Sequence, residues 1–350
     1  MIKYLGSKRL LAASLAEVAR RLGARTAGDM FAGTTRVGQA LRTAGIRVVS
    51  NDTAAYSEVL GQAYIEAGED VDRGRVRELL AHLDALPGEE GYVTETFCRR
   101  SRYFKPANGM RIDAIRREID RLDLSRTERA LALTSLLEAA DRVDSTVGVQ
   151  MAYLKRWAPR AAQRLTLREP EPVAGPPGSA VRSDANYLAA GLDGVDLAYL
   201  DPPYNQHCYA GNYHVWETIV RGDAPPHYGV ACKRVDVRER RSPYNSRRRA
   251  WDVLADLVER LPTPWLVISF SNEGFHELDA MRSMLAQRGH VASRHIDAPR
   301  YVGARIGIHD PAGRRVGTVS HVRNREVVFV CGPDRALADA ALEDALPVAV

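Results

Sequence analysis

Helical and extended hydrophobic patterns alternate over the first 52 residues of the chain. Apolar residues at helical spacing predict a helix over residues 9–22, and a second helix is expected over residues 36–44. Short apolar segments ending at Asp29 and covering residues 46–50 predict two strands. Helices that alternate with strands in this way connect the strands of a parallel sheet, so an α/β fold is expected.

A long helical segment interrupts this alternation. Residues 55 to about 170 are predicted to be mostly helical, and Ser125 and Glu128 have the spacing of a capping box at the start of one helix. The Pro- and Gly-rich stretch 169–178 has the composition of a linker. We therefore expect an inserted helical domain over residues 56–180.

The strand pattern returns in three apolar runs, at residues 195–200, 265–270 and 326–331. Continuous apolar runs of this length are typical of buried strands in a parallel sheet. The sheet domain is thus predicted to combine residues 1–55 with residues 181–350.

Composition favours an ordinary globular protein, with 45% hydrophobic and 27% charged residues. No apolar run is long enough to span a bilayer, and the first residues lack the apolar stretch of a secretory signal, so a cytoplasmic location without membrane partners is expected. The four cysteines are not spaced as metal ligands, and we expect neither a zinc site nor a disulfide.

The net charge of +5 is concentrated in two segments that also carry aromatic residues. Basic residues surround Tyr103 and Phe104 over residues 99–105, and a second cluster over residues 238–249 contains Tyr244. Basic side chains neutralise phosphates and interleaved rings can stack on bases, so both segments are candidates for a nucleic-acid surface; the alternative is two solvated loops. The predicted phosphate contacts are Arg247, Arg248 and Arg249.

The most informative motif is Asp201-Pro202-Pro203-Tyr204, which directly follows a predicted buried strand. Ligands of open α/β sheets bind outside the carboxyl ends of the strands. The two prolines fix the backbone and remove two N–H donors, which leaves carbonyl oxygens beside the Asp201 carboxylate. Such a pocket accepts hydrogen bonds without donating any and has an aromatic wall. It suits a planar group that bears an NH₂, such as adenine, whereas the alternative is a tight loop that only ends a strand.

These residues resemble a known family of enzymes. Asp201-Pro202-Pro203-Tyr204 is similar to the catalytic DPPY motif of amino-methyltransferases, and residues 3–9 resemble the motif that opens the D12 class of adenine-specific DNA methyltransferases. Residues 29–33 are similar to the cofactor loop of that class, Asn51-Asp52 to its ribose-binding acid, and residues 269–274 to a later strand-end motif. The order of the motifs is that of the alpha group, which includes the Dam-like enzymes. The insert resembles the FokI-modification-like members more closely.

The resemblance implies a Rossmann-like methyltransferase sheet with helices on both faces and a helical target-recognition insert. It also implies S-adenosylmethionine as the cofactor. Family motifs carry cofactor contacts over to Tyr4, Lys8, Phe31, Gly33, Asp52, Asp184 and Asp201. The alternative for Asp52 is a helix N-cap or turn residue, and for Asp184 a plain turn residue. From the residues alone, Tyr4 and Lys8 are better explained as parts of a solvated N-terminal arm, and it is the resemblance that favours a cofactor role for them.

One segment departs from the family pattern. The cofactor loop usually continues FxGxG, but here Thr34 and Thr35 follow Gly33. A threonine does not adopt a positive φ cheaply, so the local path of this loop stays open while the cofactor assignment does not depend on it.

The function expected from the family is methylation of adenine N6 in double-stranded DNA by base flipping, as part of a restriction-modification system. Double-stranded DNA and a cognate restriction endonuclease are the expected partners. Asp201 and the Pro202 carbonyl would accept the two N6 hydrogens, and Tyr204 would stack on the base. The alternatives are N4-cytosine methylation, which more often uses a serine where Asp201 stands, RNA or protein amide methylation, and a non-catalytic DNA-binding protein on a methylase scaffold.

Overall fold

The computed structural model describes residues 2–6, 8–271, 274–299, 308–309, 315–317 and 323–346. The chain divides into two compact units. A sheet unit contains Gly6–Thr53, Val173–His207 and Ser242–Val350, and a helical unit contains Met1–Leu5, Ala54–Pro172 and Cys208–Arg241.

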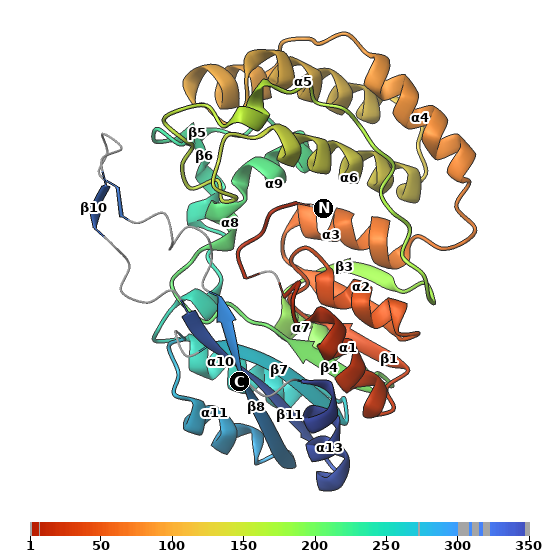
Figure 1. Cartoon of the computed structure of the whole chain (residues 1–350), viewed down its shortest axis with the longest axis vertical. Helices are drawn as coiled ribbons and strands as arrows, with labels where there is room; N and C mark the ends of the chain where they lie inside the picture. Colours follow the sequence, from red (N-terminus) through yellow and green to blue (C-terminus); the bar gives the residue numbers. More distant parts are fainter. Residues whose placement is uncertain are drawn as a thin grey trace. The chain divides into compact units, whose positions relative to one another are not determined.

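A seven-stranded sheet forms the centre of the sheet unit, in the order β3-β2-β1-β4-β7-β11-β8 (Figure 1). The first five strands of this order pair in parallel, whereas β11 runs antiparallel to both β7 and β8. The strands are β1 (Thr26–Asp29), β2 (Arg47–Asp52), β3 (Ser179–Arg182), β4 (Leu197–Leu200), β7 (Trp265–Ser271), β8 (His290–Pro299) and β11 (Arg323–Gly332).

Helices cover both faces of this sheet, as expected for a Rossmann-like methyltransferase fold. Helices α1, α2 and α13 pack together on one face, and α7, α10 and α11 lie on the other (Figure 1). Their bounds are α1 (Ala12–Arg21), α2 (Arg36–Thr43), α7 (Ala185–Ala189), α10 (Ala250–Arg260), α11 (Leu278–Leu285) and α13 (Arg335–Ala345). Every residue of β4 and β7 is buried, which explains their unbroken apolar runs.

The sequence predictions for this unit are confirmed in part. The two helices and two strands expected in the first 52 residues are present as α1, β1, α2 and β2. The run at 326–331 is a buried strand, but the prediction that it lies in a parallel part of the sheet is wrong. The strands β3 and β8 were not predicted. β3 begins directly after a Pro- and Gly-rich segment, and β8 has neither a continuous apolar run nor a regular alternation of polar and apolar residues.

The helical unit is built mainly from five helices of seven to eighteen residues, together with several shorter elements. Its longer elements are α3 (Ala55–Gly61), α4 (Arg73–Ala85), α5 (Pro106–Arg121), α6 (Arg126–Val143) and α9 (His214–Arg221). Its shorter elements are η1 (Gln62–Glu66), η2 (Thr94–Arg100), η3 (Pro159–Ala162), α8 (Tyr209–Asn212), β5 (His227–Tyr228), β6 (Lys233–Arg234) and η4 (Val235–Arg238).

The capping box predicted at the start of α6 is confirmed. The Ser125 side chain accepts a hydrogen bond from the Glu128 backbone N–H at 3.2 Å, and the Glu128 carboxylate accepts one from Ser125 N–H at 2.8 Å. The limits of the unit differ from the expected insert at 56–180, because Met1–Leu5 and Cys208–Arg241 also belong to it. The later segment contributes α9, which packs against α3 and α6. No helix in the described part of the chain is long and apolar enough to cross a membrane.

Candidate active site at the carboxyl ends of the parallel strands

The strand order reverses at β1, which has β2 on one side and β4 on the other. The loops that leave such neighbouring parallel strands diverge, and the crevice at their carboxyl ends is the usual ligand site of an open α/β sheet. Three of the predicted motifs end up here. Asp29 is the last residue of β1, Asp52 the last of β2, and Asp201 follows the last residue of β4.

The loop after β1 turns sharply between Phe31 and α2. Gly33 has φ +51° and Thr35 has φ +62°, both in the left-handed region. Thr35 is fully buried, and its Oγ1 accepts a hydrogen bond from Gln39 Nε2 at 2.8 Å while its N–H donates to Ala32 O at 2.6 Å. The loop therefore makes the turn with a threonine at a position that glycine would take at lower cost.

Asp52 holds this loop against the end of β2. Its Oδ2 accepts a hydrogen bond from Gly33 N–H at 2.9 Å, and Ala32 N–H donates to Asn51 O at 2.9 Å. Phe31 lies edge-on to Tyr244 with the ring centroids 5.2 Å apart. The predicted residues Phe31, Gly33 and Asp52 thus belong to one local structure.

Asp201 lies in a buried charge cluster. Its Oδ1 is 3.2 Å from Lys8 Nζ, and the same ammonium group is 3.6 Å from Glu326 Oε2 on β11. The Lys8 side chain is only 6% exposed, and each of the two carboxylate side chains is 18% exposed. The remainder of the motif surrounds this acid: Pro202 is buried, and the ring of Tyr204 packs edge-on against Phe270 at 5.7 Å.

Burial and neighbouring charges shift the acidity of this cluster. Burial raises the pKa of Asp201 to about 6, with Lys8 opposing this shift and Glu326 adding to it. Burial opposes the charged form of Lys8, yet the carboxylates of Asp201 and Glu326 outweigh it and hold the Lys8 pKa above its usual range. Lys8 is therefore a permanent ammonium, and Asp201 is a carboxylate at neutral pH.

Asp29 is a second buried acid at this edge of the sheet. Its Oδ2 accepts a hydrogen bond from Gly38 N–H at 3.2 Å, whereas its buried Oδ1 has no partner in good hydrogen-bond geometry among the described residues, although the Phe31 backbone also stabilises the carboxylate. Burial, with the nearby charge of Asp201, raises the pKa of Asp29 to about 7. Sequence reasoning included Asp29 in the cofactor motif but did not select it as a site residue, because nothing in the sequence shows which motif residues are buried.

Two predicted cofactor residues have other contacts in the structure. Asp184 caps α7, since its Oδ1 accepts hydrogen bonds from the backbone N–H groups of Asn186 at 2.9 Å and Tyr187 at 3.3 Å. Tyr4 belongs to the helical unit, where it stacks on Tyr213 with the ring centroids 4.3 Å apart. Of the strand-end motif at 269–274, Asn272 and Glu273 lie outside the described residues.

The predicted phosphate contacts are on the surface of the sheet unit. Arg247, Arg248 and Arg249 are all exposed directly before α10. Within the described part of the chain, none of the three forms an ion pair with a carboxylate. Other arginines of the same basic cluster are engaged within the helical unit: Arg238 lies over the Tyr228 ring at 4.1 Å, and Arg240 pairs with Glu217 at 2.8 Å.

The prediction that aromatic residues inside the basic clusters stack on bases is wrong. Tyr103 and Phe104 are fully buried, and Tyr244 is 3% exposed and donates a hydrogen bond to Asn186 Oδ1 at 2.6 Å. Basic side chains in these segments stand at the surface, whereas the rings between them belong to the cores. The basic residues of the first cluster are also compensated in part, because Arg100 pairs with Glu95 at 2.9 Å.

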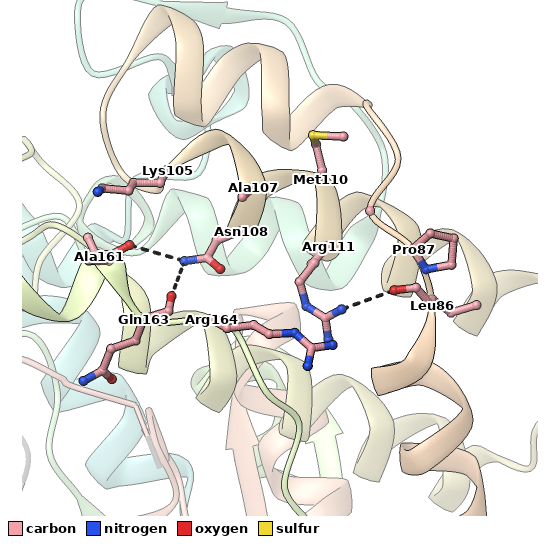
Figure 2. A pocket seen from close by; sticks show the side chains of 12 residues that line it. Leu86, Pro87, Lys105, Ala107, Asn108, Met110, Arg111, Ala161, Gln163 and Arg164 are labelled. Atoms are coloured by element: carbon pink, nitrogen blue, oxygen red, sulfur yellow. Dashed lines mark hydrogen bonds between the residues drawn. The ribbon is translucent and has the colours of Figure 1, made fainter.

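The helical unit contains an open cavity of about 550 Å³. Its lining comes from residues 86–88, the start of α5 and residues 161–164 (Figure 2). Figure 2 shows the guanidinium groups of Arg111 and Arg164 close together, and burial together with the charge of Arg164 lowers the pKa of Arg111. Arg111 pairs with Asp84 at 2.8 Å, whereas Lys105 and Arg164 have no carboxylate partner among the described residues.

Comparison with known proteins identifies the family to which most of the chain is similar. Residues 4–284 match the family model of the D12 class N6 adenine-specific DNA methyltransferases. The type II methyltransferase M.NlaIII of Neisseria lactamica is 32% identical over 303 residues, which cover 82% of this chain and 89% of that protein. M.FokI of Planomicrobium okeanokoites is 30% identical over 309 residues, 82% of this chain and 47% of that protein.

A viral relative has the same extent. The type II methyltransferase M.CviAII of Paramecium bursaria Chlorella virus 1 is 28% identical over 300 residues, which cover 82% of this chain and 89% of that protein. The matched region contains the Asp29 loop, Asp52 and Asp201, which the fold brings to one edge of the sheet. The chain belongs to the D12 class of N6 adenine-specific DNA methyltransferases.

Proposed function

We propose that the protein transfers a methyl group from S-adenosylmethionine to N6 of an adenine that is flipped out of duplex DNA. Asp201 is the catalytic residue that accepts a hydrogen bond from the N6 amino group. The observation that carries this proposal is the environment of Asp201. It is a carboxylate at a strand end, paired with a permanent ammonium and followed by two prolines that have no N–H to donate.

The residues at the ends of β1 and β2 fit the methyl donor. S-adenosylmethionine supplies an electrophilic methyl group on a positively charged sulfur. Asp29 Oδ1 is a buried acceptor without a well-placed hydrogen-bond partner among the described residues, and a cationic or hydrogen-bonding ligand would satisfy it. Asp52 would bind the ribose hydroxyls, and Phe31 and Gly33 would line the site. The resemblance to the family adds Tyr4, Lys8 and Asp184 as further cofactor contacts.

The acceptor amine is the difficult partner in this reaction, because its lone pair is delocalised into the purine ring. Asp201 and the Pro202 carbonyl would each accept one N6 hydrogen and orient the nitrogen for in-line attack. This is catalysis by positioning and electrostatic preorganisation, and Asp201 need not be a strong base because the methylated ammonium is acidic. Tyr204 would stack on the extrahelical base, since a base inside the duplex does not reach such a pocket.

The DNA would be held by positive charge that the fold leaves without a carboxylate partner. On the sheet unit this describes Arg247, Arg248 and Arg249, and on the helical unit it describes Lys105 and Arg164 at the open cavity. Contacts of this kind to phosphates give affinity and register, and base-edge contacts give the sequence choice. We assign target recognition mainly to the helical unit.

The type II relatives suggest a biological setting. We propose that methylation protects DNA from a restriction endonuclease of matching sequence specificity. DNA from a host that expresses the protein would be sequenced with modified-base detection to find the motif. That motif would then be cloned in methylated and unmethylated form and exposed to endonucleases that cut it. Cleavage of both forms alike would contradict a protective role.

The chemistry is tested by mass spectrometry of nucleosides from DNA treated with wild-type protein, Asp201→Asn or Asp201→Ala. N6-methyladenine is expected from the wild type, with a loss on the order of 10² to 10³ in single-turnover rate for Asp201→Asn. Isothermal calorimetry with S-adenosylmethionine checks that the variants still bind the donor. N4-methylcytosine in the wild-type digest, or near-normal turnover by Asp201→Ala, would refute the proposal.

A further inference from the structure

Glu326 shares the ammonium group of Lys8 with Asp201. It lies on β11, at residue 326, beyond the region 4–284 that matches the family model. Its Oε2 is buried, has no hydrogen-bond partner in the part of the chain that the structure describes, and is 3.6 Å from Lys8 Nζ. A buried carboxylate is costly unless a partner compensates it, so a residue of this kind at the edge of an active site calls for a functional explanation.

We infer that Glu326 is a positioning residue that acts on Asp201 through Lys8. It holds the ammonium between two carboxylates and so prevents Lys8 from neutralising Asp201 completely. The inference rests on the proposed role of Asp201 as the acceptor of the N6 hydrogens. An acceptor that is fully committed to an adjacent ammonium is a weaker acceptor for the substrate, because its negative charge is already compensated.

The strand order explains how Glu326 reaches this place. β11 lies between β7 and β8 and runs antiparallel to both, and Glu326 is paired in register with Ser271 at the carboxyl end of β7. Glu326 thus lies near the start of β11, at the edge of the sheet where the parallel strands end. A parallel strand at this position would bring its first residues to the opposite edge, so the antiparallel direction is what delivers a second acid to Lys8.

The charged and titratable groups near Asp201 come from several elements. Lys8 faces it from the segment before α1, Glu326 from β11 and Asp29 from β1, while Tyr199 lies on β4 and Tyr204 in the following loop. With one ammonium and the carboxylates of Asp201 and Glu326, the cluster carries a net negative charge even when Asp29 is protonated. Replacing Glu326 by a neutral residue would leave Lys8 and Asp201 as a balanced pair.

The test is the pH dependence of the single-turnover methylation rate in Glu326→Gln, which keeps the size of the side chain and removes its charge. Loss of a neighbouring negative charge lowers the proton affinity of Asp201. The acidic limb of the pH–rate profile, where protonation of Asp201 reduces the rate, should therefore move to lower pH by roughly half a unit to one unit. The rate on the plateau should fall several-fold, because Asp201 is then a weaker acceptor. In Lys8→Gln the limb should move to higher pH.

Three controls separate this inference from others. Glu343→Gln removes an equally charged side chain from the exposed surface of α13 and should leave the limb in place. The series is repeated in an Asp29→Asn background, so that titration of Asp29 is not mistaken for that of Asp201. Glu326→Asp retains the charge and should restore most of the wild-type profile if the substituted proteins melt at similar temperatures.

The outcomes distinguish the two proposals. An unmoved limb in Glu326→Gln, with an inactive Asp201→Asn, would overturn the role of Glu326 and leave the proposed function intact. Near-normal turnover by Asp201→Asn would overturn the proposed function itself. A limb that moves to higher pH in Glu326→Gln would contradict the electrostatic argument directly.

Discussion

The Oδ2 of Asp52 accepts a hydrogen bond from the backbone N–H of Gly33 at 2.9 Å. The residue assigned to the ribose of the methyl donor therefore also ties the end of β2 to the loop after β1. Asp52→Asn keeps an oxygen that accepts the Gly33 N–H, whereas Asp52→Ala removes both functions. The two substitutions can thus separate ligand binding from loop structure.

We predict that Asp52→Asn weakens S-adenosylmethionine binding by about tenfold, through loss of the charge-assisted hydrogen bonds to the ribose, with little change in melting temperature. Asp52→Ala should weaken binding further and lower the melting temperature as well. Calorimetry and thermal unfolding measure the two effects, and DNA binding at fixed salt serves as the control. Equal donor affinity in the wild type and Asp52→Asn would remove Asp52 from the donor site.

Much of the sheet unit was predictable because its periodic patterns are strong. Helix–strand alternation in the first 52 residues and the buried run of β4 led to the correct elements around Asp29 and Asp201. The direction of β11 was not predictable, since an apolar run is the same whichever way its neighbours run. For that reason the sequence gives no indication that Glu326 meets Lys8.

The basic clusters show a different limit. The sequence of residues 99–105 shows that basic and aromatic side chains lie next to one another. Whether the aromatic side chains are buried depends on which helices pack over the segment. Tyr103 and Phe104 contribute to a core that residues far along the chain complete, since the Tyr103 hydroxyl lies 2.8 Å from Gln150 O and 3.0 Å from Ala231 O and can donate its one hydrogen to either. Arginines that pair with carboxylates are structural, and those that do not are candidate DNA contacts. This distinction is visible only in the folded structure.

Thr35 provides a stability prediction for the cofactor loop. The residue is buried at φ +62°, and its hydroxyl group both donates to Thr34 O at 2.7 Å and accepts from Gln39 Nε2 at 2.8 Å. Thr35→Val keeps the shape but leaves these groups without their partner, so unfolding should be easier by about 1–3 kcal/mol. Thr43→Val on the exposed side of α2 is the matched control and should stay within about 0.5 kcal/mol of wild type in urea titrations.

Asp29 should make the stability of the ligand-free protein depend on pH. Its pKa is raised by burial to about 7 in the folded state, so the folded protein binds more protons than the unfolded chain between about pH 4 and pH 7. The contribution of Asp29 to stability is therefore complete at low pH and is lost as the pH rises through 7. Asp29→Asn does not titrate, and its stability relative to wild type should increase by roughly 2–4 kcal/mol between pH 5 and pH 8. A pH-independent difference in urea unfolding would contradict the assigned acidity.

The surface arginines before α10 are tested by salt dependence. Replacement of Arg247, Arg248 and Arg249 by alanine should reduce the slope of log affinity for DNA against log salt by up to about 2.7, which is about 0.9 for each lost phosphate contact. The control removes the same charge from three exposed arginines of the sheet unit that already pair with acids: Arg20, Arg21 and Arg260. If the control variant changes the slope as much, net charge rather than contact explains the effect.

The cavity in the helical unit allows the same comparison, with paired arginines of the neighbouring helix α5 as the control. Lys105 precedes α5 and Arg164 lies across the cavity, and neither has a carboxylate partner among the described residues, whereas Arg117 and Arg121 of α5 pair with Glu89 and Glu118. A phosphate held between unpaired cations would lose about two contacts in the Lys105→Ala/Arg164→Ala variant, and the salt slope should fall by about 1.8. Arg117→Ala/Arg121→Ala carries the same charge change and should leave the slope near the wild-type value, because those guanidinium groups are already neutralised.

The affinity for S-adenosylmethionine should be unchanged in both double variants. Equal slopes for the two double variants would remove the cavity from the DNA surface, and the helical unit would then have to bind DNA through other residues.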